Sequence, residues 1–354
     1  MNIFNTDKAL IISEIGINHD GSLDKAKEMI RVSAECGADI CKFQLLIADQ
    51  MYSKKAGNYV NSSGSYPIYN IIRDSELGKD WIPQLRSACE KHNVGFLMTI
   101  CDLVGLEQIL HFQPSMLKIA SSEISYLPLF REIGKLDVPL IFSSAASTLG
   151  DIEEALNALG KTENICLMHC NGKYPTPPEG VNINVLKTYS MAFPDLTLGF
   201  SDHTEDPVEA PVAALGVGAK LIEKHFTLDK NSPGPDHSFA VDPEGLKALV
   251  SSVRKAEKDL SSGYDLVIDE SLLGSSAKKV TEHEKYLRDF CYRSIFSSAD
   301  IQEGDLFSEE NLIILRNGEQ EKGLHPRELH NLIGNSCPKA VEKGTPVNWE
   351  TLLK

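Results

Sequence analysis

Short apolar stretches alternate with longer amphipathic ones over roughly the first 260 residues, a pattern typical of strands followed by helices. Segments with helical periodicity include 102–111, 148–160 and 243–261. The predicted strands cover residues 9–15, 39–44, 94–99, 115–120, 139–143, 165–170, 196–201 and 220–225. Eight repeats of strand and helix within about 250 residues predict a (β/α)8 barrel, the TIM-barrel architecture.

The first repeat shows the plan most plainly. An apolar strand carries Glu14 near its end, a polar turn follows between Gly16 and Gly21, and Ser22 is placed to cap a helix. Parallel barrels keep their chemistry where strands end and loops begin. Glu14 is therefore a candidate catalytic carboxylate.

Two regions depart from the repeat. Residues 45–77 form an unusually long connection on the side of the barrel where active sites lie, and we predict a lid there. The barrel domain is expected to span 1–262, followed by a charged, partly helical linker over 263–290. Short strands and turn signals over 291–354 predict a small second domain. Because so short a domain has a thin core, it should lean on its own barrel or on a partner chain.

Composition narrows the class of protein. The chain has 354 residues, of which 42% are hydrophobic and 24% charged, as in ordinary globular proteins. It lacks an apolar run long enough for a membrane helix and begins without a secretory pattern, so we expect a cytoplasmic location. Eight cysteines without a C-x-x-C pair suggest reduced thiols.

The net charge of −15 argues against non-specific nucleic-acid binding. It also requires local cations wherever an anionic substrate binds. Lys42 and Lys118 interrupt two apolar strands, and alternation places Lys42 on one face with Ile40 and Gln44. A lysine in apolar surroundings costs free energy unless it is paired. Either each pairs with a structural carboxylate, or the two bind an anion together; we favour the anion site.

Two histidines follow neighbouring predicted strands. His203 comes just after the seventh strand, and His225 ends the eighth. Two imidazoles with open positions beside them suit a divalent metal ion that also binds a substrate oxygen. The alternative is a pair of hydrogen-bonded core histidines; we favour the metal.

Rigid turns follow the sixth and eighth strands. Residues 173–178 and 231–237 are rich in proline or glycine, and they would hold Tyr174 and Asp236 at the rim of the barrel. Proline-rich turns are common, so a purely structural role is the alternative.

Seven sequence strings mark these strand ends. In chain order they are SEIGINHDG, CKFQ, KIASSE, HCNGKYPTP, GFSDHT, EKHFTL and GPDHSF. Together they resemble the sialic acid synthase (N-acetylneuraminate synthase) family, and the segment from Tyr292 onward resembles that family's antifreeze-like (SAF) domain. The resemblance covers nearly the whole chain. It implies a TIM barrel followed by a small, β-rich SAF domain.

The resemblance also implies an activity. Members of this family condense phosphoenolpyruvate with an N-acylated amino sugar, such as N-acetylmannosamine, to give a nine-carbon 2-keto acid and phosphate. Glu14 would then be catalytic, and His203 and His225 would bind Mn2+ or Mg2+. Phosphoenolpyruvate would be held by Lys42, Thr99, Lys118, Ser121, Ser143 and Ser201. The sugar would contact Gln44, Tyr174, Asp236 and Arg316. Arg316 would come from the SAF domain of a second subunit, because the family forms domain-swapped homodimers.

Three segments depart from the family pattern. Gly172 stands where the family has serine or asparagine, Ala145 and Ala146 replace part of a Thr-Gly-Met-like turn, and Asn317 replaces a proline. These changes suggest that the sugar differs from N-acetylmannosamine.

Two other functions remain open. Lys42 or Lys118 would suit a Schiff-base aldolase if burial lowered its pKa. A non-catalytic sugar-binding barrel would fit the three departures. We favour the condensation because both histidines, both lysines and Glu14 are kept.

Overall fold

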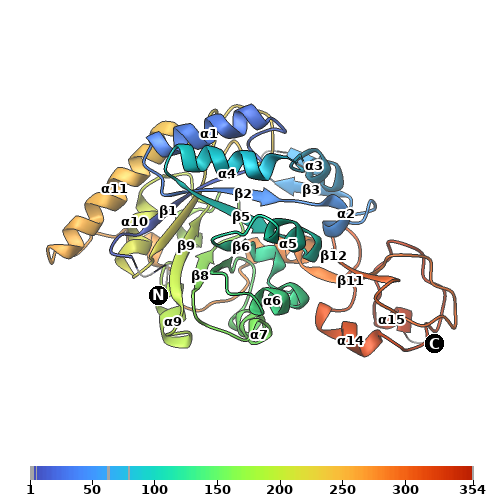
Figure 1. Cartoon of the computed structure of the whole chain (residues 1–354). Helices are drawn as coiled ribbons and strands as arrows, with labels where there is room; N and C mark the ends of the chain where they lie inside the picture. The colour runs from blue at the N-terminus through green and yellow to red at the C-terminus, as the bar shows by residue number, and fades with distance from the viewer. Residues whose placement is uncertain (1–3, 5, 62–63, 79, 353–354) are drawn as a thin grey trace.

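The computed structural model describes residues 4, 6–61, 64–78 and 80–352. Eight parallel strands close into a barrel in the order β1-β10-β9-β8-β7-β6-β5-β2, which confirms the TIM-barrel prediction (Figure 1). The strands are β1 (Leu10–Gly16), β2 (Ile40–Leu45), β5 (Gly95–Ile100), β6 (Leu117–Ile119), β7 (Leu140–Ser143), β8 (Ile165–Cys170), β9 (Thr197–Asp202) and β10 (Leu221–His225). Each predicted strand overlaps one of these.

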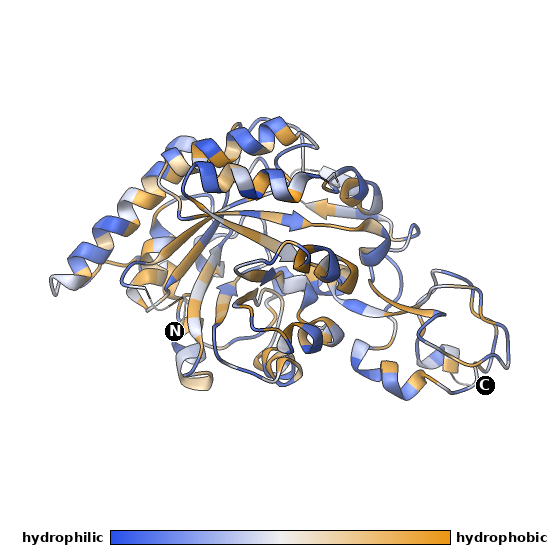
Figure 2. Cartoon of the chain, in the orientation of Figure 1, coloured by the Kyte–Doolittle hydropathy of each residue, from blue (hydrophilic) through white to orange (hydrophobic). Residues whose placement is uncertain are grey.

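Helices pack around the outside of the barrel. They are α1 (Leu23–Glu35), α4 (Trp81–Lys91), α5 (Leu103–Leu110), α6 (Leu127–Gly134), α7 (Leu149–Leu159), α9 (Val185–Ala192), α10 (Glu209–Gly216) and α11 (Pro243–Ser261). Figure 2 shows hydrophilic and hydrophobic residues alternating along outer helices such as α1 and α11. Local signals set their starts: Ser22 caps α1, and Thr148 and Asp151 form a reciprocal capping box at α7.

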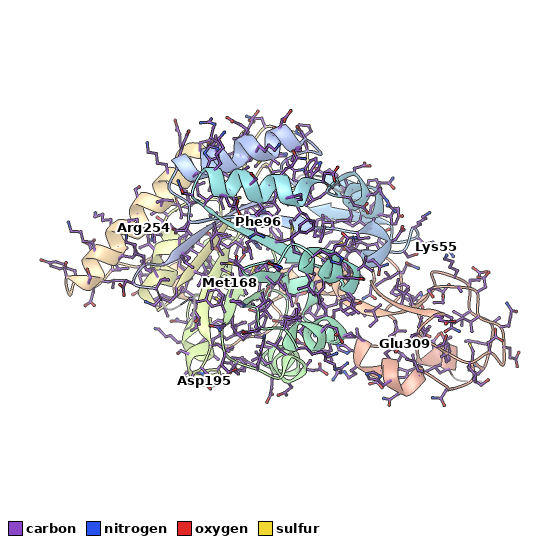
Figure 3. The ribbon with its side chains drawn as sticks, in the orientation of Figure 1. Lys55, Phe96, Met168, Asp195, Arg254 and Glu309 are labelled. Atoms are coloured by element: carbon purple, nitrogen blue, oxygen red, sulfur yellow. The ribbon has the colours of Figure 1, made fainter. Side chains whose placement is uncertain are left out.

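The barrel interior changes character from one end to the other. Its amino-terminal half is filled by an apolar cluster that includes Met168, labelled near the middle of the molecule in Figure 3. The other members are Phe4, Ile12, Ile40, Leu97, Met116, Ile141, Cys166 and Leu221. Alternate residues of a strand point inward, so Glu14 and Lys42 lie one step above Ile12 and Ile40. The apolar layer thus supports a polar layer at the carboxyl ends of the strands.

The long connection after β2 is folded rather than a plain loop, which corrects the sequence-based description. It contains α2 (Ala48–Met51), an antiparallel hairpin of β3 (Asn58–Asn61) and β4 (Gly64–Pro67), and α3 (Ile68–Asp74). Aromatic packing helps to hold this segment in place, because the ring of Tyr59 stacks on the ring of Tyr286 with centroids 6.1 Å apart. Whether the segment moves as a lid stays a prediction.

After the barrel, the chain crosses back over it. This stretch contains α12 (Glu270–Leu273), a 3-10 turn η2 (Glu282–Glu284) and α13 (Lys285–Cys291). The SAF domain follows, with β11 (Arg293–Ser297) paired antiparallel to β12 (Leu312–Arg316), η3 (Pro326–Glu328), α14 (Leu329–Leu332) and α15 (Trp349–Leu352). Figure 1 shows it in orange and red beside α5 and α6.

The SAF domain packs against its own barrel. Its buried residues, such as Ile295, Phe307 and Val347, belong to the same apolar cluster as the outer layer of the barrel. Arg293 is fully buried at this junction and donates to the carbonyl oxygens of Gln50 in α2 (2.7 Å) and of Cys101 just after β5 (2.6 Å). These bonds fix the domain over the carboxyl ends of the strands.

Two further expectations concern the whole chain. All eight cysteines are free in this structure. Across the described residues, every helix is too short or too polar to cross a membrane.

Candidate active site

A cavity of about 200 Å³ opens at the carboxyl ends of the barrel strands. Of the thirteen side chains predicted from the sequence, twelve line this cavity: Glu14, Lys42, Gln44, Lys118, Ser121, Ser143, Tyr174, Ser201, His203, His225, Asp236 and Arg316. Thr99 is the exception. It lies just beneath, where its hydroxyl accepts a hydrogen bond from Lys42 Nζ at 3.3 Å.

The floor of the cavity is a compact cluster of four charges. Lys42 Nζ lies 3.3 Å from Glu14 Oε2 and 3.1 Å from Glu223 Oε1, and Lys118 Nζ lies 3.4 Å from Glu223 Oε2. Strand register produces this arrangement, because Glu14 is paired with Lys42 on one side and with His225 on the other. The two interpretations of the lysines therefore coincide: they are paired with carboxylates and they also line a cavity.

Hydroxyl and amide groups complete the floor. Lys118 Nζ donates to Ser143 Oγ at 2.5 Å, and Ser201 Oγ donates to Glu223 Oε1 at 3.0 Å. Gln44 Nε2 donates to Glu14 Oε1 at 2.6 Å. These hydrogen bonds fix the positions of the floor groups, and charged groups held in fixed positions are what electrostatic catalysis requires.

Burial and the attraction between opposite charges shift the pKa values of these groups in different directions. Burial raises the pKa of Glu14, against the attraction of Lys42. Burial would also raise the pKa of Glu223, but Lys118 and Lys42 outweigh it and hold that pKa below its usual value. Burial lowers the pKa of Lys118, whereas for Lys42 the two glutamates overcome burial and raise the pKa. Glu14 is consequently the floor carboxylate suited to hold and release a proton.

The two histidines lie side by side, with ring centroids 5.4 Å apart. Tyr174 stacks on His203 with a centroid distance of 4.0 Å, and Phe239 contacts His225 at 5.1 Å. Burial lowers the pKa of His203 to about 4, and burial together with His203 lowers the pKa of His225. Both rings are therefore neutral near pH 7, with lone pairs that can bind a metal ion.

Hydrogen bonding also fits a metal ion. His203 Nδ1 lies 2.6 Å from the carbonyl oxygen of Asn171, so it carries the proton and leaves Nε2 as the lone pair. His225 Nδ1 is buried and lacks a hydrogen-bond partner within the described residues. No group of three or more histidine, cysteine or acidic side chains could hold a metal ion in the described part of the chain. A metal ion here would need ligands from substrate or water as well.

Arg316 occupies a different setting from the predicted one. It reaches the cavity from the SAF domain of the same chain, through a bridge between Tyr52 and β12, rather than from a second subunit. Its guanidinium pairs with Glu123, which pairs with Arg293 through its other oxygen. Packing of β11 and β12 on the chain's own barrel explains the difference. A homodimer stays a prediction.

Sequence reasoning missed several residues of this site. Glu223 lies two positions before His225 on the same strand face, so alternation could have identified it. Its neighbour Lys224 points the other way and pairs with Asp202. Leu287 of α13 also lines the cavity, and no local sequence signal indicates this.

These features define a TIM-barrel enzyme whose site combines paired lysines and carboxylates with two neutral histidines. A family model described as NeuB family matches residues 29–265, and one described as SAF domain matches 292–353. The chain belongs to the NeuB family, so the sialic acid synthase resemblance is confirmed.

Known relatives agree with this assignment. The spore coat polysaccharide biosynthesis protein SpsE of Bacillus subtilis is 44% identical over 347 residues, covering 97% of this chain and 93% of the relative. Its crystal structure superimposes with a TM-score of 0.87 at 43% identity, over 98% of this chain and 96% of that one. The N,N'-diacetyllegionaminic acid synthase of Campylobacter jejuni is 35% identical, covering 87% and 90%. An N-acetylneuraminic acid synthetase structure from Leptospira borgpetersenii has a TM-score of 0.66 at 28% identity, covering 75% and 88%.

Proposed function

We propose that this protein condenses phosphoenolpyruvate with an N-acylated amino sugar, giving a nine-carbon 2-keto acid and phosphate. The observation that carries the proposal is the convergence of Lys42, Lys118 and the two histidines on one cavity. The names of the relatives support an amino-sugar acid as the product class.

Phosphoenolpyruvate would bind on the floor. Its phosphate and carboxylate groups are anionic, and Lys42 and Lys118 are the cations that line the cavity floor. Burial raises the pKa of Glu14, whereas Lys118 and Lys42 outweigh burial and hold the pKa of Glu223 below its usual value, so Glu223 is the carboxylate that mainly offsets the two lysines. Neutral hydroxyls would accept or donate the remaining hydrogen bonds, from Thr99, Ser121, Ser143 and Ser201.

The reaction forms one carbon–carbon bond at C3 of phosphoenolpyruvate and replaces the C2–O bond to phosphate by a bond from C2 to the oxygen of water. C3 of phosphoenolpyruvate attacks the aldehyde carbon of the open-chain sugar, whose oxygen takes up a proton. Water adds at C2 and gives up a proton, and the C2–O bond to phosphate then breaks, leaving the 2-keto group. Glu14, whose pKa is raised by burial, is placed to carry a proton in these steps.

His203 and His225 would hold Mn2+ or Mg2+. Their neutral rings and the free nitrogen of His225 fit such an ion, and Asp236 Oδ2 lies 3.8 Å from His225 Nδ1. The ion would supply electrophilic polarisation of the sugar's carbonyl group. The chain's own contribution is to keep both rings deprotonated and fixed by the Asn171 carbonyl and the Tyr174 ring.

The amino sugar would lie above phosphoenolpyruvate, toward the rim. Gln44 on the floor and Tyr174, Asp236 and Arg316 at the rim line the cavity, and they would bind the hydroxyl and acyl groups of the sugar. The acceptor would be N-acetylmannosamine or a related hexosamine, and the diacetylated product of the Campylobacter relative supports a related hexosamine.

A phosphate-release assay tests the proposal. The protein is incubated with phosphoenolpyruvate, Mn2+ and each of a panel of N-acyl hexosamines, and mass spectrometry identifies the acid formed. We expect phosphate and a nine-carbon 2-keto acid with at least one sugar, and none when the sugar is omitted. Absence of phosphate with every sugar would count against the condensation.

One observation favours a second candidate, a Schiff-base aldolase. Burial lowers the pKa of Lys118, as that chemistry needs. Borohydride would then trap a substrate carbonyl on Lys118, and EDTA would leave activity intact. The ion pair with Glu223, which favours the charged ammonium, argues against it.

A further inference from the structure

The linker of this chain covers the loops after β7 and β8. Glu284 Oε1 accepts hydrogen bonds from the backbone N–H groups of Ala146 (2.7 Å) and Gly172 (3.0 Å). Its other oxygen accepts from the backbone N–H and hydroxyl of Thr281, at 3.1 and 2.9 Å. One buried carboxylate therefore ties the linker to both loops.

The next turn of the linker strengthens the same attachment. Arg288 donates to the carbonyl oxygen of Ala146 at 2.7 Å and pairs with Asp151 at 2.8 Å. The Tyr292 hydroxyl also donates to that carbonyl at 2.8 Å. Both backbone polar groups of Ala146 are thus bound to the linker, so α13 has a fixed position over the site.

Fixing α13 places Leu287 in the cavity wall. A Cβ atom added at Gly172 would lie 2.2 Å from Leu287 Cδ2, closer than two carbon atoms can approach. Ala145 is the next neighbour of such an atom, at 3.5 Å. The family departures at 172 and 145–146 are therefore the places where this linker packs, and Leu287 takes space that a larger residue at 172 would use.

The chemistry of this wall differs from that of the floor. Leu287 comes from the linker and not from a barrel strand, and it faces the same cavity as Tyr59 and Phe239. An anionic first substrate held by the floor lysines leaves this apolar layer for the second substrate. Burying a methyl group against an apolar side chain is favourable, whereas burying a hydroxyl group there without a hydrogen-bond partner costs free energy.

We propose that Leu287 is a specificity-determining residue, packing against a methyl substituent of the acceptor sugar, and that Gly172 leaves the space that Leu287 occupies. This inference rests on the proposed condensation and names the part of the chain that selects its acceptor. It assigns the selection to the linker of the same chain.

Pairs of acceptors that differ by one hydroxyl group test it. N-acetyl and N-glycolyl hexosamines form one pair, and 6-deoxy and 6-hydroxy N-acetylhexosamines form the other. For each, kcat/KM is measured from phosphate release for the parent protein, Leu287→Ser, Gly172→Ala and the double variant. Lys285→Ala, an exposed change on the same helix, is the matched control.

In at least one pair, we expect the parent to favour the methyl form and Leu287→Ser to reduce that preference roughly 10- to 100-fold. Gly172→Ala should reduce it as well, by displacing Leu287, and the double variant should show no further loss. KM for phosphoenolpyruvate and the Lys285→Ala control should not change. Leu287→Met, which conserves volume, should keep the preference and shows that position 287 tolerates change.

Two results would overturn the inference while the parent remains active: an unchanged preference in Leu287→Ser, or an effect confined to phosphoenolpyruvate. Failure of the parent to release phosphate with any sugar is a different outcome. It overturns the proposed function, and this inference with it.

Discussion

The floor and the rim of the cavity come from different parts of the chain. The floor side chains Glu14, Lys42, Lys118 and Glu223 all lie on barrel strands, within one or two residues of their carboxyl ends in most cases. The rim side chains lie outside those strands, on the β3–β4 hairpin, the loop after β10, the linker and β12: Tyr59, Asp236, Phe239, Leu287 and Arg316. The barrel supplies a charged centre, and added segments supply its surroundings.

The difference separates two functions that one cavity must combine. The floor holds two lysines and two glutamates in mutual contact, so a change at one alters the others. The rim consists largely of aromatic and apolar side chains that contact a ligand one at a time. We therefore expect floor substitutions to lower kcat and rim substitutions to change the KM for the acceptor sugar.

Replacing a floor lysine should give the largest effect. Lys42→Met removes the cation between Glu14 and Glu223, leaving two carboxylates facing an anionic substrate. We expect kcat/KM to fall by roughly 100- to 1,000-fold, the range for removing one preorganised charge-stabilising group. Phosphate release measures it. Lys220→Met, at an exposed position just before β10, is the control; equal activity in both variants would contradict a role for Lys42.

Removing a proposed metal ligand should give the next largest effect. His225→Ala takes away one of the two neutral imidazoles, and we expect a loss on the order of 100-fold together with weaker Mn2+ binding. EDTA should inactivate the parent, and added Mn2+ should restore it. Calorimetric titration with Mn2+ gives a measurement independent of turnover. The exposed His111→Ala is the control, and full activity of the parent in EDTA would exclude a metal-dependent reaction.

The sequence predicted the floor far better than the rim, for a physical reason. Inward and outward positions alternate along a strand, so Glu14, Lys42 and Lys118 could be placed from the residue pattern alone. Glu223 follows from the same rule, because it shares its face with His225. All these placements need only local geometry and the closure of the barrel.

The rim depends on contacts between segments distant in sequence. Leu287 reaches the cavity because Glu284 binds the loops after β7 and β8, more than one hundred residues earlier in the chain. Arg316 was predicted to lie at the cavity, but a sequence does not reveal which copy of a domain covers which barrel. The folded hairpin after β2 was predicted as a loop because its strands are only four residues each.

Replacing Arg316 should give a smaller effect than replacing Lys42 or His225. The variant also tests whether the rim and the floor of one cavity come from the same chain. Arg316→Ala should raise the KM for the sugar roughly tenfold, since one charged hydrogen-bonding partner is lost, and should leave the KM for phosphoenolpyruvate unchanged. Glu123 keeps its pairing with Arg293, so the fold should persist.

Co-expressing Arg316→Ala with Lys42→Met then separates the two arrangements. If each chain completes its own site, every site carries one defect and the mixture gains no activity beyond that of its two components. If a partner subunit supplied Arg316, random pairing in a swapped dimer would restore about one quarter of the sites. Differently tagged chains, purified in tandem, show whether mixed dimers form at all.

Asp236 should give the smallest effect and distinguishes rim from floor by pH. Burial, together with the charge of Glu14, raises the pKa of Asp236 to about 7, whereas the pKa of Glu223 on the floor is lowered because Lys118 and Lys42 outweigh burial. Asp236 should therefore ionise near neutral pH, and the KM for the sugar should change a few-fold between pH 6 and 8, as expected for a binding group whose pKa lies within that range. Asp236→Asn should flatten this profile without moving the KM for phosphoenolpyruvate.

The same substitution makes a prediction for stability. Because the pKa of Asp236 in the folded chain exceeds its ordinary value, the folded state holds the proton more tightly than the unfolded state. Its contribution to the free energy of unfolding is full below about pH 4 and is lost as pH rises through about 7. Since 23% of the side chain is exposed, Asp236→Asn should stabilise the metal-free protein at pH 8 by only about 1–2 kcal/mol. Urea unfolding at pH 5 and pH 8 measures this free energy, with the exposed Asp195→Asn as control. An equal gain in stability at both pH values would show that Asp236 does not carry a raised pKa. The electrostatic contrast between rim and floor would then be lost.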